Sequence, residues 1–135
     1  VIADPVSTED FFPTLCGLVG ITPRNPMPGV DLTPLIRGAV TGLDREGVLL
    51  EAVHDFRPSA AQYNRPYRGV RTRRWKYTVL AGPRGAQPWQ LFDLEADPFE
   101  LRNRVNDPAL RETQRYLHQW LRNRLRQTDD HFLLE

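Results

Sequence analysis

The stretch from Tyr67 to Asn103 constrains the fold of this chain more than any other part of the sequence. Its segment WKYTVL (75–80) places Trp, Tyr and Val on one face of an extended strand and Lys, Thr and Leu on the other. The segment YRGVRT (67–72) precedes it, and only Arg73 and Arg74 separate the two. Such a short connection between two extended segments predicts a tight antiparallel hairpin.

Two further segments complete a small sheet. WQLFDL (Trp89–Leu94) follows a break at residues 82–85 that contains two glycines and a proline, and it is expected to form the strand after the hairpin. The apolar run Gly47–Val53 is predicted to be a central strand. A bare hairpin is only marginally stable in water, so the sheet needs a covering layer. The predicted fold is therefore α+β, with an antiparallel sheet of about four strands.

The covering layer is predicted to be a helix over Pro108–Gln127. Asp107 has the character of an N-cap residue, and Pro108 suits the first helical position. One apolar stripe recurs at helical spacing: Leu110, Leu117, Leu121 and Leu125, with Trp120 beside them. We expect this leucine stripe to pack on one face of the sheet. A second stripe contains Arg111, Arg115, Arg122 and Arg126 and is expected to be solvated, with Glu112 and Arg115 paired locally.

The N-terminal part is predicted to contain another helix, Phe11–Val19. Asp10 is expected to cap it by accepting a hydrogen bond from the N–H of Phe12, and Gly20 to end it. Pro13 then falls in the first turn, where the backbone N–H groups have no partner inside the helix. The segment from Asp31 to Gly38 repeats the same pattern of a carboxylate, a proline and a terminating glycine.

Composition excludes several classes of protein. The 135 residues include 18 basic and 17 acidic ones, so no strong overall field favours nucleic acid or an anionic membrane. Cys16 is the only cysteine, which excludes an internal disulfide framework. No run of about 18 apolar residues is present to span a bilayer. The first ten residues lack the basic and apolar regions of a signal peptide.

The segment LFDLEADPFELRN (91–103) resembles the C-terminal signature of the sulfatase family, which belongs to the alkaline phosphatase superfamily. That signature reads Leu-(Tyr/Phe)-Asp-Leu, then Asp-Pro-x-Glu, then Asn. Three more segments resemble the family in the same order: residues 6–15, with Val-Ser, Asp and Pro-Thr-Leu; GVDLTPLIRG (29–38), with Asp31 where the family has Ser; and residues 67–77. The resemblance thus extends over nearly the whole chain.

By this resemblance, residues 1–46 would be the tail of a catalytic α/β domain and its linker, and residues 47–135 a C-terminal sulfatase-like subdomain. The family uses calcium and a formylglycine made from the Cys or Ser of a Cys/Ser-x-Pro-Ser-Arg motif. Cys16 is followed by Gly-Leu-Val-Gly and does not fit that motif. The resemblance therefore implies that calcium and formylglycine belong to a catalytic domain outside this chain. This chain would be non-catalytic by itself and would support the fold and the active-site rim.

The missing catalytic domain is then the expected partner. If the chain is separated from a larger domain, its side chains Phe11, Phe12, Leu15 and Leu18 cannot all be covered internally, so we also expect self-association or an exposed apolar patch.

Only a few residues are candidates for a site. His54 and Arg57 open a long loop after the strand 47–53 and could touch substrate at the rim, although ordinary polar loop residues would look the same. The signature side chains are expected to make turns by bonding to local backbone: Asp93, Asp97, Pro98, Glu100 and Asn103. No catalytic residue and no metal ligand is predicted in this chain.

Other polar clusters have simpler explanations. The segment RTRR (71–74) beside two aromatic residues could contact nucleic acid, but the balanced charge argues against it. Asp129, Asp130 and His131 are consecutive, so they are poorly placed to converge on one ion and are expected to form a flexible tail. His118 lies on the arginine side of the last helix and is expected to be solvated.

Two alternatives to a sulfatase remain open from the sequence. The same C-terminal architecture occurs in phosphonate and phosphodiester hydrolases of the superfamily, whose discriminating residues lie elsewhere. A stand-alone, non-catalytic module that binds a protein or a sulfated glycan would also be compatible with these residues.

Overall fold

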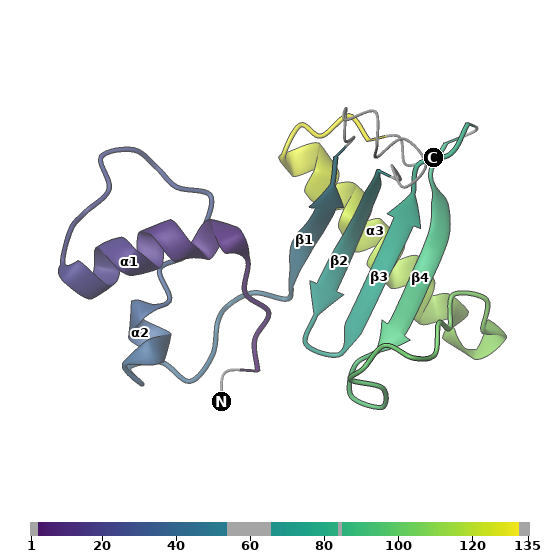
Figure 1. Cartoon of the computed structure of the whole chain (residues 1–135), viewed down its shortest axis with the longest axis horizontal. Helices are drawn as coiled ribbons and strands as arrows, with labels where there is room; N and C mark the ends of the chain where they lie inside the picture. The colour runs from purple at the N-terminus through teal and green to yellow at the C-terminus, as the bar shows by residue number, and fades with distance from the viewer. Residues whose placement is uncertain (1–2, 54–65, 84, 133–135) are drawn as a thin grey trace, which may run out of the picture. The chain divides into compact units, whose positions relative to one another are not determined.

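The computed structural model describes residues 3–53, 66–83 and 85–132 (Figure 1). It divides into two compact parts, Val1–Val48 and Leu49–Glu135, called unit 1 and unit 2 below. Unit 1 contains a 3-10 turn, η1 (Thr8–Asp10), and the helices α1 (Phe11–Val19) and α2 (Thr33–Ile36). The assignment of residues 1–46 to the tail of a catalytic domain stays a prediction.

A four-stranded sheet organises unit 2. Its strands are β1 (Gly47–Ala52), β2 (Tyr67–Thr72), β3 (Trp75–Leu80) and β4 (Gln87–Asp93), and β1 begins at the boundary between the units. The spatial order is β1-β2-β3-β4, and neighbouring strands run in opposite directions (Figure 1). The predicted hairpin is confirmed with its two-residue connection, and so is the α+β class. β4 begins two residues earlier than the aromatic pattern indicated. The prediction of a central strand over Gly47–Val53 is wrong, because β1 lies at the edge of the four-stranded sheet and buries only Val48.

The register of the strands places the large apolar side chains on one face. Val70 lies opposite Tyr77, and Tyr77 lies opposite Leu91 across the next ladder. Directly opposed residues of antiparallel strands share a face, so these three side chains form one row. Gly69 allows the close approach of β2 and β3, because a Cβ there would lie 2.5 Å from the carbonyl oxygen of Tyr77.

One long helix covers that face. A 3-10 turn, η3 (Pro108–Leu110), leads into α3 (Arg111–Gln127), and Asp107 caps the turn by accepting from the N–H of Ala109 at 2.9 Å. The core of unit 2 joins the sheet to the helix through these buried residues: Val70, Tyr77, Val79, Leu91, Leu117, Leu121 and Leu125. The predicted packing of the leucine stripe on one face of the sheet is confirmed by this core, and Figure 1 shows α3 lying across one face of the sheet.

The start of α1 differs from the prediction. Its bounds and its end at the left-handed Gly20 are as expected, but Asp10 makes no capping hydrogen bond to the helix. The capping residue is Ser7, which precedes η1 and forms a reciprocal capping box with Asp10. Asp10 already has helical dihedral angles, so its carboxylate is directed away from the N–H of Phe12. Within α1 itself, Pro13 is the third residue and so lies in the first turn.

The Asp10 carboxylate instead links three segments of unit 1. Asp10 is fully buried and accepts from both terminal nitrogens of Arg45, at 2.6 and 2.8 Å. It also accepts from the N–H groups of Ser7 and Val30, both at 2.8 Å. Burial alone would raise its pKa, but these bonds outweigh burial and lower the pKa of Asp10 from 3.8 to about 2.

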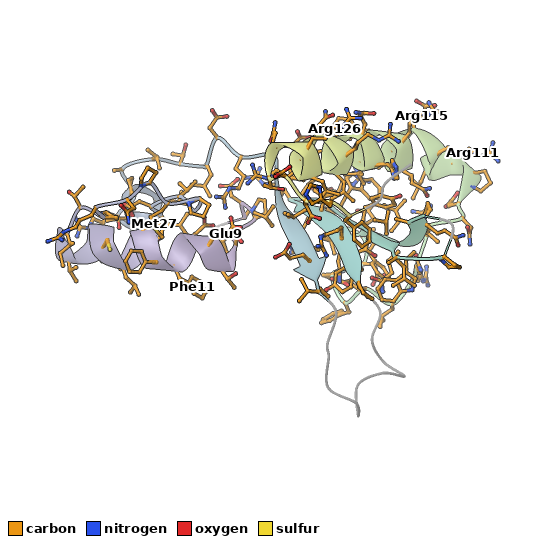
Figure 2. The ribbon with its side chains drawn as sticks, turned by 90° about the horizontal axis from the view of Figure 1, so that it is seen from above. Glu9, Phe11, Met27, Arg111, Arg115 and Arg126 are labelled. Atoms are coloured by element: carbon orange, nitrogen blue, oxygen red, sulfur yellow. The ribbon has the colours of Figure 1, made fainter. Side chains whose placement is uncertain are left out.

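The apolar face of α1 is open to solvent. The exposed side chains are Phe11 (61%), Phe12 (54%), Leu15 (61%), Leu18 (41%) and Val19 (70%). The buried face carries Pro13, Thr14 and Cys16. The exposed apolar patch expected from the sequence is therefore present, and Figure 2 shows Phe11 at the surface of α1. In the described parts of the chain, no helix combines the length and apolar character needed to cross a membrane.

Candidate functional site

The loop that leaves β4 carries the signature residues, and its first turn is built around Asp93. This nearly buried carboxylate accepts from the N–H groups of Glu95 and Ala96 at 3.3 and 3.4 Å. It also pairs with Arg74, whose Nη2 lies 2.8 Å from Oδ2. The hydrogen bond from Arg74 lowers the pKa of Asp93. Because Arg74 lies in the connection between β2 and β3, its pair with Asp93 links the loop to the hairpin. The Arg74 guanidinium also lies 4.7 Å from the ring of Trp75.

The middle of the loop is held by two more carboxylates. Asp97 accepts from the N–H of Arg102 at 2.8 Å and bridges the segment that contains Pro98. Glu100 has φ of 56°, a left-handed conformation that is costly for a residue with a Cβ. Its carboxylate forms an ion pair with Lys76 of β3, and the Lys76 nitrogen lies 5.7 Å from the ring of Phe92.

Asn103 closes the loop against the outer strand of the sheet. Its side-chain oxygen accepts from the N–H of Leu91 at 3.0 Å, and its amide nitrogen donates to the carbonyl of Trp89 at 2.9 Å. Arg104 then donates its backbone N–H to the carbonyl of Leu91 at 2.8 Å. These bonds satisfy backbone groups that the edge of β4 would otherwise expose. The bonds of Asn103 join segments 12 and 14 residues apart, so it does more than make a local turn.

The chemistry of this loop suits binding more than catalysis. Its carboxylates are engaged by arginine, lysine or backbone N–H groups, and no nucleophile lies among them. The loop presents two apolar side chains, Phe99 and Leu101, each 80% exposed. A rigid loop that displays apolar side chains is a surface suited to contact with another protein segment.

The two residues predicted for the substrate rim, His54 and Arg57, lie outside the described residues. Their role remains a prediction.

The structure corrects two expectations about the last helix and the tail. Asp130 is not part of a free tail, because its carboxylate accepts from Arg68 Nε at 2.6 Å and is only 15% exposed. His118 is not simply solvated, because its Nδ1 lies 3.0 Å from the hydroxyl of the buried Tyr77. The arginine stripe is largely exposed, and the local pair of Glu112 with Arg115 is present at 2.7 Å. Arg122 departs from that expectation, since its Nε is buried.

Sequence reasoning missed two arginines that organise the structure. Arg45 holds Asp10 across 35 positions of the chain. Arg68 is nearly buried and also donates to the carbonyl of Ala52 at 3.2 Å, and its guanidinium lies 4.9 Å from the ring of Phe132. The only local signal for Arg68 is its place in the alternation of β2, where it shares a face with Val70.

The described residues do not provide a metal or formylglycine site. Within 3–53, 66–83 and 85–132, no group of three or more His, Cys, Asp or Glu side chains could hold a metal ion. Cys16 is buried on α1 and lacks the Pro-Ser-Arg sequence that formylglycine formation would require by the resemblance. The described side chains therefore show no carboxylate cluster of the kind that calcium needs, and the sequence after Cys16 does not fit the formylglycine motif.

Comparison with known proteins identifies the family. The small antiparallel sheet, its single covering helix and the Asp-Pro-x-Glu loop define a C-terminal domain of the sulfatase type. Residues 1–127 match the family described as N-sulphoglucosamine sulphohydrolase, C-terminal, and the chain belongs to that family.

Known relatives agree with this assignment. The chain is 33% identical over 129 residues to an ulvan-active sulfatase of Formosa agariphila, covering 95% of this chain and 24% of that protein. It is 40% identical over 108 residues to a choline-sulfatase of Rhizobium meliloti, covering 77% of this chain and 18% of that protein. A solved 2-O GAG sulfatase superposes with a TM-score of 0.74 at 29% identity, covering 90% of this chain and 25% of that one. The chain thus spans about a quarter or less of the length of these relatives.

Proposed function

We propose that this chain is the C-terminal, non-catalytic part of a sulfuric ester hydrolase and that it supports the fold and the active-site rim of a separate catalytic domain. The observation that carries the proposal is the family match over residues 1–127, in a chain that spans only 18% to 24% of related sulfatases. The described residues also lack a cluster of metal-binding side chains. In this proposal the catalytic domain supplies the formylglycine nucleophile and the calcium ion.

The expected partner is that catalytic domain, and α1 is its main contact surface on unit 1. Five apolar side chains on consecutive turns of α1 are exposed, from Phe11 to Val19. An apolar stripe of this size on a helix is normally buried against another element. In unit 2, the loop with Phe99 and Leu101 offers a second apolar contact of the same kind.

The proposal predicts that the chain by itself does not hydrolyse sulfate esters. Purified chain should convert 4-nitrophenyl sulfate in the presence of calcium no faster than buffer does. The matched control is a complete sulfatase, such as the ulvan-active relative, assayed under the same conditions. Turnover that remains with the chain through purification would contradict the proposal, because the chemistry would then lie in these 135 residues.

A further inference from the structure

A pocket of about 340 Å³ lies between α3 and strands β3 and β4 in unit 2. It is lined by Tyr77, Pro88, Arg111, Gln114, Arg115 and His118. This volume falls at the lower end of the range for small-molecule sites and suits a single sugar ring. None of these residues belongs to the signature loop, so the pocket is a separate feature of the domain.

The open side of the pocket is positively charged. Arg111 and Arg115 are four residues apart on α3, so they project from the same face of the helix. Arg111 forms no ion pair within the part of the chain that the structure describes. Arg115 pairs with Glu112, but both side chains are exposed, at 71% and 85%, and such pairs are weak. Both guanidinium groups can therefore bind an anion at little cost.

The floor of the pocket is rigid and largely apolar. Tyr77 is fully buried in the core, and its hydroxyl lies 3.0 Å from Nδ1 of His118. This bond fixes the imidazole ring against the sheet. Pro88 adds an apolar wall, and the Gln114 amide can both donate and accept a hydrogen bond. An apolar wall beside an amide matches a sugar, which has C–H surfaces and hydroxyl groups.

The charge of the whole helix supports an anionic ligand. α3 contains five arginines and one glutamate, although the complete chain has 18 basic and 17 acidic residues. The arginines are thus concentrated on this element and leave the remainder of the chain acidic. Arg122 lies one turn beyond His118, and its buried Nε has no hydrogen-bond partner among the described residues. Arginine is the residue best suited to bidentate binding of oxyanions.

We propose that this pocket is an accessory binding site for a sugar that carries a sulfate monoester. Arg111 and Arg115 bind the sulfate oxygens, and the pocket formed by Pro88, Gln114 and His118 holds the sugar ring. The choice of sulfate over another oxyanion rests on the proposed function. The existence of an anion-binding pocket does not depend on that function. Nucleic acid is a poorer fit, because the pocket has no Phe or Trp and its one phenol ring, Tyr77, is buried and has no open face on which a base could stack.

The test is isothermal titration calorimetry of the full chain at low ionic strength, with glucose 6-sulfate, glucose 6-phosphate, glucose and sodium sulfate as separate ligands. Glucose 6-sulfate is expected to bind more tightly than glucose or sodium sulfate, because only the ester offers both the ring and the anion. The double variant Arg111→Gln/Arg115→Gln is expected to bind it about tenfold or more weakly. Figure 2 shows Arg126 toward the opposite end of α3, so Arg126→Gln is the matched control and should bind within about twofold of the parent chain.

Each other outcome has a defined meaning. The site is refuted if glucose 6-sulfate does not bind, if sodium sulfate binds equally well, or if Arg126→Gln weakens binding as much as the double variant. Tighter binding of a single-stranded oligonucleotide with the same arginine dependence would also refute it.

Equal binding of glucose 6-phosphate would support the site while removing the preference for sulfate. Tryptophan fluorescence during denaturation should follow the same curve for the double variant as for the parent chain. This agreement excludes misfolding as the cause of a loss of binding. Sulfate ester turnover by the chain would overturn the proposed function and leave this result unaffected.

Discussion

Helices α1 and α3 use their apolar faces in opposite ways. α3 buries Leu117, Leu121 and Leu125 against the sheet and exposes most of its arginines. α1 leaves its large apolar side chains in solvent and buries Pro13, Thr14 and Cys16. A helix gains most of its stability in a protein from packing an apolar face. α3 therefore packs its apolar face inside this chain, whereas α1 leaves its own exposed, and the proposed function assigns the covering partner to the catalytic domain.

The strongest test of this difference compares one leucine from each helix. Leu121→Ala should lower the free energy of unfolding of unit 2 by about 3 kcal/mol, because it leaves a cavity in a fully buried position. Leu15→Ala removes a side chain that is 61% exposed and should leave that value nearly unchanged. Trp75, Trp89 and Trp120 all lie in unit 2, so tryptophan fluorescence in urea measures this unit. Equal losses for the two variants would contradict the contrast between the helices.

The second prediction concerns what holds α1 in place. The pKa of Asp10 is lowered from 3.8 to about 2, so its ion pair contributes stability above pH 3.8 and loses it as the pH falls through 2. The shift corresponds to about 2 kcal/mol. Asp10→Asn should therefore speed amide exchange of residues 11–19 by up to about thirtyfold at neutral pH.

The effect of Asp10→Asn should be lost near pH 2, where the parent carboxyl is itself becoming protonated. Glu9→Gln is the control, because Glu9 precedes Asp10 and is exposed. A difference between Asp10→Asn and the parent chain that stays constant down to pH 2 would exclude the ion pair as its cause.

Self-association gives the third test. The double variant Phe12→Ser/Leu15→Ser removes two large exposed side chains from α1 and should weaken any self-association of the chain about tenfold or more. Sedimentation velocity over a range of concentrations measures this change. The control Arg111→Ser/Arg115→Ser alters exposed residues of α3 and should not change how the sedimentation coefficient depends on protein concentration. A parent chain that stays monomeric throughout would show that the stripe is not a self-association surface.

The smallest expected effect concerns the end of the chain. Asp130→Asn should destabilise unit 2 by about 1 kcal/mol, because it weakens the bond to the nearly buried Arg68. The bonds from Arg68 and from the N–H of Phe132 outweigh burial and lower the pKa of Asp130. Asp129→Asn at the neighbouring exposed position is the matched control and should have no measurable effect in the same urea titration. Identical midpoints for the two variants would show that Asp130 is not a tether.

The parts of the fold that the sequence predicted well are those with local causes. β2 and β3 have the predicted bounds because a strict alternation and a two-residue connection leave little choice of register. α1 and the leucine stripe of α3 follow from helical spacing and from their start and stop residues.

The errors involve partners far away in the sequence. Asp10 binds Arg45, 35 positions away; Asp130 binds Arg68, 62 away; and His118 contacts Tyr77, 41 away. Local propensity had assigned Asp10 to a helix cap, Asp130 to a free tail and His118 to a solvated face. A single sequence carries no signal for such pairings, because they depend on the completed tertiary structure.

A domain exchange tests most directly whether this chain is a supporting domain whose α1 surface contacts a catalytic domain. The matched quarter of the ulvan-active sulfatase is replaced by this chain, and sulfate ester turnover of the soluble product is compared with that of the relative lacking this quarter. We expect the exchange to restore turnover and Phe12→Arg in the exchanged segment to abolish it, while Arg126→Gln leaves it unchanged. Restored turnover that is insensitive to Phe12→Arg, or no gain over the shortened relative, would contradict the account.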